Sequence, residues 1–591
     1  MSATSRKRSE EFLKISGQFK LGALVTESSH PVTAHLSDVA KKDIPSALKL
    51  LFEADGDVIN KFREFVRSGK AEQIKETILQ SLKDGGRIFF TGCGSTGRLS
   101  IQLDSVWRDF WQEQPSAQDF ENRTLSVMAG GDYALIKSVE GFEDFTAFGK
   151  KQISDLGVSS KDVVFAITEG GETSFVIGTA WAGVEAGAKV YFVYNNPDDI
   201  LGEHVQRSRE VIQDSRIEKI NLTTGPMSIT GSTRMQATSI QLCVMLLILE
   251  MVVRELTGKK KTGAPLPSQF LAALEKLHSN LMSPQVLASL AKLVALEESV
   301  YRAGHKNNYF ADRFSIDVLT DTTERSPTYC TPPFRKFDDT TASESWAFLF
   351  LPQDETPPAW QHLLKRQPRC VEWSESEARQ LVGDDKLPRT LETLRKIGRA
   401  ELMRFKIGLD GLPGRVLRRD DCAIAIMSES ETDPLFLPNS FFSGQLNAAK
   451  KAGAKTAIIH FGQAPVTAAK TVFVPLPQTD FLLDGIARIA VKLVMNALST
   501  CTMVRLGRVM GNTMIWVVPS NLKLIDRATR YISRLTGLSY ELANQLLFEV
   551  IEYVEPRMKT DRAYPPVVGL AVLRAKENLT NEQAEERLNR F

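Results

Sequence analysis

Two segments of this chain, residues 162–189 and 421–455, follow one pattern, and this repetition constrains the fold most. Each begins with an aspartate and an apolar run, Asp162–Ile167 in the first and Asp421–Ile426 in the second. Each continues through a polar turn and a helical stretch to the sequence Ala-Gly-Ala-Lys. Repetition on this scale indicates two copies of one structural unit. We therefore predict two homologous α/β domains.

Strand-like and helical runs alternate around the first copy. The predicted strands there are Arg87–Thr91, Leu125–Ala129, Asp162–Ile167, Lys189–Tyr194 and Lys219–Leu222. Helical spacing follows the first, the third and the last of them. This alternation favours a parallel sheet with helices on both faces.

The second half gives a similar, less regular pattern. Its predicted strands are Ser299–Ala303, Ala347–Leu351, Asp421–Met427 and Thr456–Phe461, with a helix over Asn439–Ala452. We interpret Asn307-Asn308 as a turn. The proline-rich stretches Arg325–Arg335 and Pro352–Pro358 are predicted loops.

Helical segments flank these two units. Ile44–Leu82 has helical spacing, and three amphipathic helices are predicted after the strand pattern fades, over Leu522–Leu535, Ser539–Tyr553 and Asn581–Asn589. We therefore divide the chain into an N-terminal cap segment (1–45), a first α/β domain (46–290), a second (291–499) and a C-terminal helical lid (500–591).

The run that ends the first predicted strand is a candidate phosphate cradle. It reads Thr-Gly-Cys-Gly-Ser-Thr-Gly-Arg over Thr91–Arg98 and leads into a helical pattern. Its glycines permit a tight turn and close approach of an anion, and the following helix offers free N–H groups and the positive end of its dipole. The spacing alone fits a sharp packing bend equally well. A dinucleotide fingerprint is disfavoured, because Leu125–Ala129 lacks the acidic residue that holds a ribose.

Composition limits the function classes. The chain of 591 residues is 43% hydrophobic and 24% charged, with 73 basic and 71 acidic side chains. Without a basic excess, nucleic acid is an unexpected partner. The six cysteines are scattered, so we expect neither a disulfide framework nor a zinc site, and no cofactor or metal. The apolar run Leu242–Val253 is shorter than the roughly 20 residues that span a bilayer, and is a predicted buried helix.

Five motifs in register carry a family resemblance. They are Thr91–Arg98, Ala129–Asp132, Val139–Asp144, Gly225–Met235 and Ser520–Leu524. Together they resemble the glucokinase regulatory protein family, which is related to N-acetylmuramic acid 6-phosphate etherase. Both contain sugar isomerase (SIS) domains that bind phosphosugars. The resemblance implies two SIS domains, each a parallel-sheet αβα sandwich, and an all-helical C-terminal lid.

The resemblance also implies a pocket for fructose 6-phosphate or fructose 1-phosphate in the first domain. Loop contacts are expected from Gly94, Ser95 and Thr96, a second wall from Thr168, Glu169, Gly170 and Glu172, and further contacts from Ser232, Thr233 and Arg234. Lys523 would reach over from the lid to the phosphate as a charge-assisted donor. Glu140 and Glu143 lie three residues apart, so on a helical turn they share a face, and this spacing alone fits a solvated charged face. The motif around them implies that they accept from sugar hydroxyls.

Three positions depart from the family pattern. Val106 stands where the etherases carry a second glutamate, and an apolar side chain moves no proton; Asp104 substitutes only if the alignment slips. Glu172 stands where Ser or Arg is usual, and a carboxylate beside a phosphate is repulsive unless it is paired. Gln236 replaces a lysine. These changes favour binding over catalysis and alter phosphate affinity.

The resemblance thus implies a non-catalytic regulator that inhibits a glucokinase- or hexokinase-type sugar kinase in response to fructose 6-phosphate or fructose 1-phosphate. A phosphosugar sensor without a kinase partner fits these residues equally well. The alternative is an etherase-type lyase with Glu140 or Glu143 as the catalytic base, and an aldose–ketose isomerase ranks third. We expect a monomer whose two SIS domains pair within one chain, without a membrane segment. Its expected location is the cytoplasm, or the nucleus in a eukaryotic source.

Overall fold

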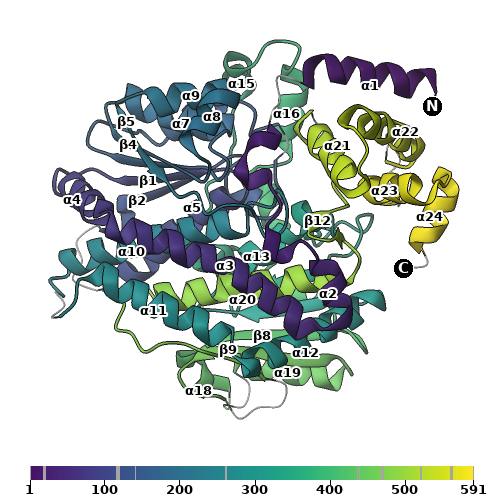
Figure 1. The fold of residues 1–591 in the computed structure, drawn as a ribbon. Helices are drawn as coiled ribbons and strands as arrows, with labels where there is room; N and C mark the ends of the chain where they lie inside the picture. The colour runs from purple at the N-terminus through teal and green to yellow at the C-terminus, as the bar shows by residue number, and fades with distance from the viewer. Residues whose placement is uncertain are drawn as a thin grey trace.

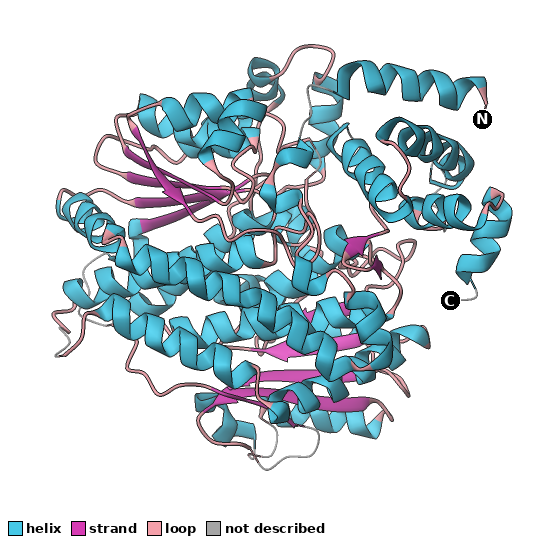
Figure 2. Cartoon of the chain, viewed as in Figure 1, coloured by secondary structure: helices cyan, strands magenta, loops and turns pink. Residues whose placement is uncertain are grey.

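The computed structural model describes residues 2–16, 21–114, 120–139, 141–259, 263–435, 437, 440–466, 471–519, 522–558 and 564–589. Two five-stranded parallel sheets form its centre and are drawn as separate groups of arrows in Figure 2. The first contains β1 (Ile88–Gly92), β2 (Thr124–Met128), β3 (Val163–Ile167), β4 (Lys189–Tyr194) and β5 (Ile217–Asn221). The second contains β6 (Asn307–Ala311), β7 (Ala347–Phe350), β8 (Cys422–Ser428), β9 (Lys455–Gly462) and β10 (Thr471–Pro475).

The two sheets have the same topology. The first has the order β2-β1-β3-β4-β5, and the second has the order β7-β6-β8-β9-β10 when read from its β7 edge. Numbered within each unit, both read 2-1-3-4-5, with every pairing in the two sheets parallel. The predicted pair of α/β domains is therefore confirmed. In this arrangement a ligand site is expected at the carboxyl ends of the first and third strands, where the chain direction along the sheet reverses.

The predicted strands of the first domain are all confirmed, with Lys189–Tyr194 placed as predicted and the other four shifted by one or two residues. Every residue of β1 and β3 is buried. Strands covered on both faces need apolar side chains on both faces, so they read as continuous hydrophobic runs rather than as an alternation.

The prediction of a strand over Ser299–Ala303 is wrong. These residues form the end of α12 (Pro284–Arg302), whose apolar positions continue at helical spacing through Val300. Gly304, at φ +74°, follows the helix, and the first strand of this domain is β6.

The Asn307-Asn308 turn is likewise corrected, because both asparagines lie in β6. Both amides form hydrogen bonds inside the fold: Asn307 donates to Glu297 over 2.7 Å, and Asn308 accepts from Arg415 over 2.6 Å. The Oδ1 of Asn307 is buried without a partner among the described residues. Polar residues in a buried central strand give no strand signal in the sequence, which explains the error.

The loop predicted over Arg325–Arg335 begins later than expected. Its first five residues belong to α13 (Ser315–Tyr329), which contains Pro327 near its end. The predicted loop Pro352–Pro358 is also shorter, since α14 (Thr356–Leu364) begins inside it with prolines in its first turn, where their missing N–H groups cost nothing. Proline therefore marked a helix end in one case and a helix start in the other.

Long helices fill the space between the two sheets (Figure 1). They include α3 (Ile44–Arg67), α10 (Gln236–Leu256) and α20 (Gly485–Arg505). α3 begins at a capping aspartate, Asp43, which accepts from the Ser46 N–H over 3.1 Å. α10 contains the predicted buried helix, and it and α20 are long and apolar enough to span a membrane, but their most apolar windows are 100% and 89% buried inside the fold. Both are core helices of the domain pair.

The C-terminal helices form a separate lobe at one side of the sheets, at the right of Figure 1. They are α21 (Leu522–Thr536), α22 (Tyr540–Met558), α23 (Val567–Glu577) and α24 (Asn581–Asn589). We call these four helices the lid. α1 (Ala3–Ser16) lies against α22, where Ser9 donates to Asn544 over 2.6 Å. The predicted helical lid is confirmed; α23, whose first seven residues are all buried, was not predicted.

Candidate functional site

The Gly-rich loop lies at the carboxyl end of β1 and leads directly into α5 (Ser95–Gln112). Gly94 has φ +56° and ψ −123°, a backbone conformation that residues with a side chain rarely adopt. Ser95 is half-buried at the first position of α5, where the leading N–H groups have no partner within the helix. The loop thus has the backbone geometry of an anion site.

Thr96 holds this loop from within. Its hydroxyl donates to the Cys93 carbonyl over 2.9 Å and accepts from the Cys93 N–H over 3.1 Å. The side chain is fully buried. Thr96 therefore fixes the shape of the cradle, and its predicted direct contact with a ligand stays a prediction.

The second wall follows β3 and contains Thr168, Glu169 and Gly170. Thr168 is fully buried, with its hydroxyl 3.2 Å from that of Thr173. Gly170 is half-buried, and its carbonyl accepts from Asn196 over 2.9 Å. Burial, together with the nearby charge of Glu324, raises the pKa of Glu169 to about 7. Its carboxyl group is therefore poised to exchange a proton near neutrality.

Glu172 ends this wall and is paired. Its carboxylate accepts from Lys523 of the lid over 2.5 Å and from Arg207 of α9 (Gln206–Gln213) over 2.9 Å. Burial raises its pKa, but the charges of Lys523 and Arg207 outweigh that effect and lower it to about 2. The carboxylate that the sequence marked as repulsive is neutralised by two cations.

Glu143 lies between this pair and the Gly-rich loop. Its Oε2 is 3.9 Å from the Sγ of Cys93, and burial raises its pKa despite the positive charge of Lys523. Glu140, predicted beside it, lies outside the described residues. Glu143 can therefore accept from a bound hydroxyl group, or hold a proton, at the edge of the loop.

A cavity of ≈ 620 Å³ opens beside these groups. Glu143, Glu172, Arg207 and Lys523 all line it, together with Leu522 and Thr173. It therefore brings the end of the second wall and the lid together, and Glu143 connects it to the Gly-rich loop.

The lid is held in place by a carboxylate that the sequence did not reveal. Glu27, in the short helix Val25–Glu27, accepts from Arg527 over 2.6 Å and from Arg530 over 3.1 Å. Burial raises the pKa of Glu27, but the two arginines lower it to about 2. Tyr531 of the same lid helix donates to the Thr230 carbonyl over 2.6 Å. These contacts fix the helix that carries Lys523.

Arg234 lies away from this cavity. Its guanidinium donates to Asp321 over 2.7 Å, to Ser499 over 2.8 Å and to Asn496 over 2.9 Å. These partners belong to α13 and α20 of the second domain, so in this structure Arg234 joins the two domains. Ser232 is buried and Thr233 half-buried beside it, and neither lines the cavity. Ligand contacts by these three residues stay predictions.

Gln236 connects the same region to a buried acid. Its amide donates to Asp55 over 3.0 Å and accepts from the Ser228 N–H over 2.9 Å. A lysine comes from the second domain instead: Lys492 donates to the Arg234 carbonyl over 2.9 Å, and burial lowers its pKa to about 8. No sequence signal marked Lys492, because it sits within the apolar helix α20.

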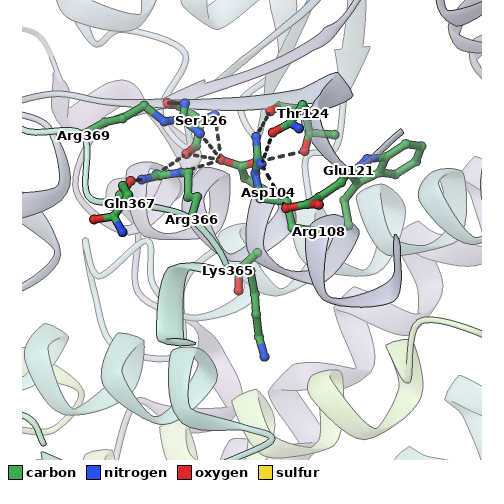
Figure 3. A network of polar contacts seen from close by, with 12 residues as sticks. Asp104, Arg108, Glu121, Thr124, Ser126, Lys365, Arg366, Gln367 and Arg369 are labelled. Carbon is green, nitrogen blue, oxygen red and sulfur yellow. Dashed lines mark hydrogen bonds and ion pairs between the residues drawn. The ribbon is translucent and has the colours of Figure 1, made fainter. Parts of the chain in front are cut away.

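Asp104, in the middle of α5, is bound in a network of arginines (Figure 3). Its carboxylate accepts from Arg108 over 2.8 Å, from Arg366 over 3.0 Å and from Arg369 over 2.8 Å. Burial raises its pKa, but the three arginines hold it well below its usual range. Val106, two residues on, is 2% exposed in the apolar core. Neither residue offers the second acid–base group of the etherases.

The second domain has a cavity of ≈ 370 Å³ at the equivalent end of its sheet. Its lining includes Arg313, which donates to Asp484 over 2.7 Å, and Glu429. The loop after β6 reads Asp-Arg-Phe-Ser and has no glycine. The charged residues of its lining are one arginine and two carboxylates, Glu429 and Asp484, and no Gly-rich cradle follows β6. Across the described parts of the chain, no group of three His, Cys, Asp or Glu residues could hold a metal ion.

Comparisons with known proteins agree with the first-domain motifs. The family model of the glucokinase regulatory protein N-terminal SIS domain matches residues 71–182. N-acetylmuramic acid 6-phosphate etherases from Yersinia pestis (strain Pestoides F) and Yersinia pseudotuberculosis (serotype O:1b) are each 30% identical over 274 residues. The alignment covers 46% of this chain and 79% of each etherase.

Similar solved structures include tagatose-6-phosphate ketose/aldose isomerase from Escherichia coli, at 9% identity and a TM-score of 0.41, covering 79% of this chain and 94% of that one. The C-terminal domain of glucosamine-fructose-6-phosphate aminotransferase from Francisella tularensis has 13% identity and a TM-score of 0.36. The match covers 76% of this chain and 96% of that domain.

Proposed function

Because the chain belongs to the family of SIS proteins that contains the glucokinase regulatory protein and the N-acetylmuramic acid 6-phosphate etherases, we propose that it is a phosphosugar-binding regulator and not an enzyme. Its proposed ligand is fructose 6-phosphate or fructose 1-phosphate. Its proposed target is a sugar kinase of the glucokinase or hexokinase class, which it inhibits when the ligand is bound. It acts as a monomer in the cytoplasm, or in the nucleus of a eukaryotic source.

One observation carries the proposal: Lys523 of the lid lines a cavity in which another lining residue, Glu143, lies against the Gly-rich loop. Lys523 lines the cavity with Glu143, and Glu143 is 3.9 Å from Cys93 of the loop. A helix N-terminus and a lysine are both groups that proteins use to bind phosphate. Glu143 and Glu169 supply acceptors for sugar hydroxyl groups. The described lining of the second-domain cavity contains no lysine, and no Gly-rich loop borders it.

The position of Lys523 also suggests how a ligand is sensed. The lid contacts the first domain through Lys523 at the cavity, and it contacts the N-terminal cap segment through Arg527 and Arg530 at Glu27. A ligand that contacts Lys523 therefore interacts with the lid and the first domain at once. By linkage, such a ligand shifts the population of lid arrangements, and a kinase that binds one arrangement responds to the ligand.

The second candidate function, an etherase-type lyase, is favoured by the 30% identity to the etherases and by Glu143. The raised pKa of Glu143 beside the Gly-rich loop suits a group that exchanges protons. The etherase pattern places a second glutamate soon after the Gly-rich loop, and Val106 and Asp104 do not provide that acid–base group. We therefore place the lyase second.

A kinase assay tests the proposal. The activity of a purified glucokinase is measured with increasing amounts of the protein, with and without fructose 6-phosphate. Inhibition that deepens with fructose 6-phosphate supports the regulator. The protein is incubated in parallel with N-acetylmuramic acid 6-phosphate. If the protein released lactate and a Glu143→Gln variant did not, the lyase would become the favoured function.

A further inference from the structure

The cavity's positive charges are already occupied by a carboxylate of the protein itself. Among the described lining residues, Arg207 and Lys523 carry the permanent positive charges, and both are bound to Glu172. Arg207 also donates to the main-chain carbonyl of Glu172. One side chain thus occupies both cations that an anionic ligand would use.

The local backbone holds Glu172 in this position. It lies between Gly171, at φ +77°, and Thr173, which precedes α7 (Ser174–Glu185). The left-handed conformation at Gly171 turns the chain so that the next side chain faces the lid. Glu172 is 7% exposed, so its charge is removed from water and depends on its partners.

The two partners differ in exposure. The side chain of Lys523 is 33% exposed and comes from the lid, whereas that of Arg207 is 45% exposed and comes from α9 of the first domain. Lys523 is thus the partner shared between domain and lid. Arg207 belongs to the same domain as Glu172 and can keep it paired if Lys523 is withdrawn.

We propose that Glu172 is a built-in anionic competitor, and that a phosphosugar binds only by taking Lys523 from it. The inference rests on the function proposed above. Without ligand, the Glu172–Lys523 pair holds the lid to the second wall. With ligand, the phosphate replaces Glu172 on Lys523, and Glu172 stays with Arg207.

This exchange selects among ligands by their charge. A phosphate near neutral pH carries between one and a half and two negative charges, and attracts Lys523 more strongly than a single carboxylate does. A sugar that carries one carboxylate offers no electrostatic gain over Glu172. The pocket therefore accepts sugar phosphates and rejects sugar acids of the same size.

A matched pair of charge-neutral variants tests the proposal. Glu172→Gln removes the competitor and keeps its size, and Glu210→Gln removes an exposed acid that lines the same cavity. The binding of fructose 6-phosphate, of inorganic phosphate and of gluconate is measured by calorimetry at low salt. A second substitution, Glu172→Ser, serves if the glutamine variant fails to fold.

We expect Glu172→Gln to bind fructose 6-phosphate about tenfold more tightly or better, because a charge-assisted contact no longer has to be broken. It should also accept gluconate, and its lid should be cleaved faster by protease in the absence of ligand. Glu210→Gln should behave as the wild type does.

Several results would overturn this. Equal affinity of the wild type and Glu172→Gln would show that Glu172 does not compete with the ligand. The proposed phosphosugar site would still stand. Weaker binding by Glu172→Gln would make Glu172 a direct ligand contact. An equal gain in affinity in both variants would show that the effect comes from the overall charge of the cavity and not from Glu172 in particular. If the wild type and both variants failed to bind any phosphate, both the proposed function and this inference would be refuted.

Discussion

Replacing Lys523 with alanine should weaken phosphosugar binding without unfolding the protein. A hydrogen bond to a charged group contributes about 1.5–3 kcal/mol. Part of this is offset, because the wild type gives up the 2.5 Å contact between Lys523 and Glu172 when it binds the ligand. We therefore expect the lower part of that range, a loss of about 10- to 30-fold in affinity.

The control for this prediction is Lys386→Ala. Lys386 lines a neighbouring cavity that shares Glu143 and Asp144, and its Nζ lies 5.1 Å from the centre of the Phe145 ring. The substitution removes the same charge at a similar place, but the Lys386 side chain contacts neither Glu172 nor the lid helix. Affinities for fructose 6-phosphate are measured by calorimetry.

The stability of Lys523→Ala should change little, since Glu172 retains Arg207 and a partly exposed ion pair contributes about 1 kcal/mol or less. Thermal unfolding measures this directly. Unchanged affinity in Lys523→Ala would refute the reasoning, because the lid would then make no contact with the ligand. Equal losses in Lys523→Ala and Lys386→Ala would reduce the effect to general electrostatics.

Three further predictions concern stability. Asp104→Asn should lower the free energy of unfolding by about 3–5 kcal/mol, because two buried arginines, Arg108 and Arg366, and the partly buried Arg369 lose their shared anion; a loss below about 1 kcal/mol in urea unfolding would contradict this. The stability of Glu169→Gln should increase relative to that of the wild type as pH rises from about 4.5 to about 7. A carboxyl whose pKa is raised by folding stabilises the protein below its unfolded pKa and loses that contribution as pH rises through the folded value, so melting temperatures that stay parallel from pH 5 to 8 would refute it. Gly94→Ala should cost about 1–3 kcal/mol in thermal unfolding through its backbone alone, since the added methyl group meets no atom within 4 Å; an unchanged melting temperature would mean that the loop is not strained.

The sequence predicted the fold where local signals were strong. The repeated strand, turn and helix pattern around Asp162–Ile167 and Asp421–Ile426 gave both domains, and continuous apolar runs gave the buried strands. It failed at β6, because Asn307 and Asn308 are polar in a central strand and are held there by hydrogen bonds to Glu297 and Arg415. The periodicity of Ser299–Ala303 was assigned to a strand although it continues α12.

The candidate site was predicted only in part. The Gly-rich loop and Lys523 were found through their motifs. The pairing of Glu172 with Lys523 was not, because it joins residues 351 positions apart and depends on how the lid docks. Arg207 and Glu27 gave no signal for the same reason: their roles arise from tertiary contacts between elements that are unremarkable in sequence.

A thermal-shift titration of the purified protein tests the central claim most directly. The ligands are fructose 6-phosphate, fructose 1-phosphate and N-acetylmuramic acid 6-phosphate, with lactate measured in the last sample. A ligand at about 100 times its dissociation constant stabilises the folded protein by about 2.7 kcal/mol. The account predicts a rise in melting temperature with a fructose phosphate and no lactate. A rise with the muramic acid phosphate alone, accompanied by lactate, would contradict it and identify an enzyme.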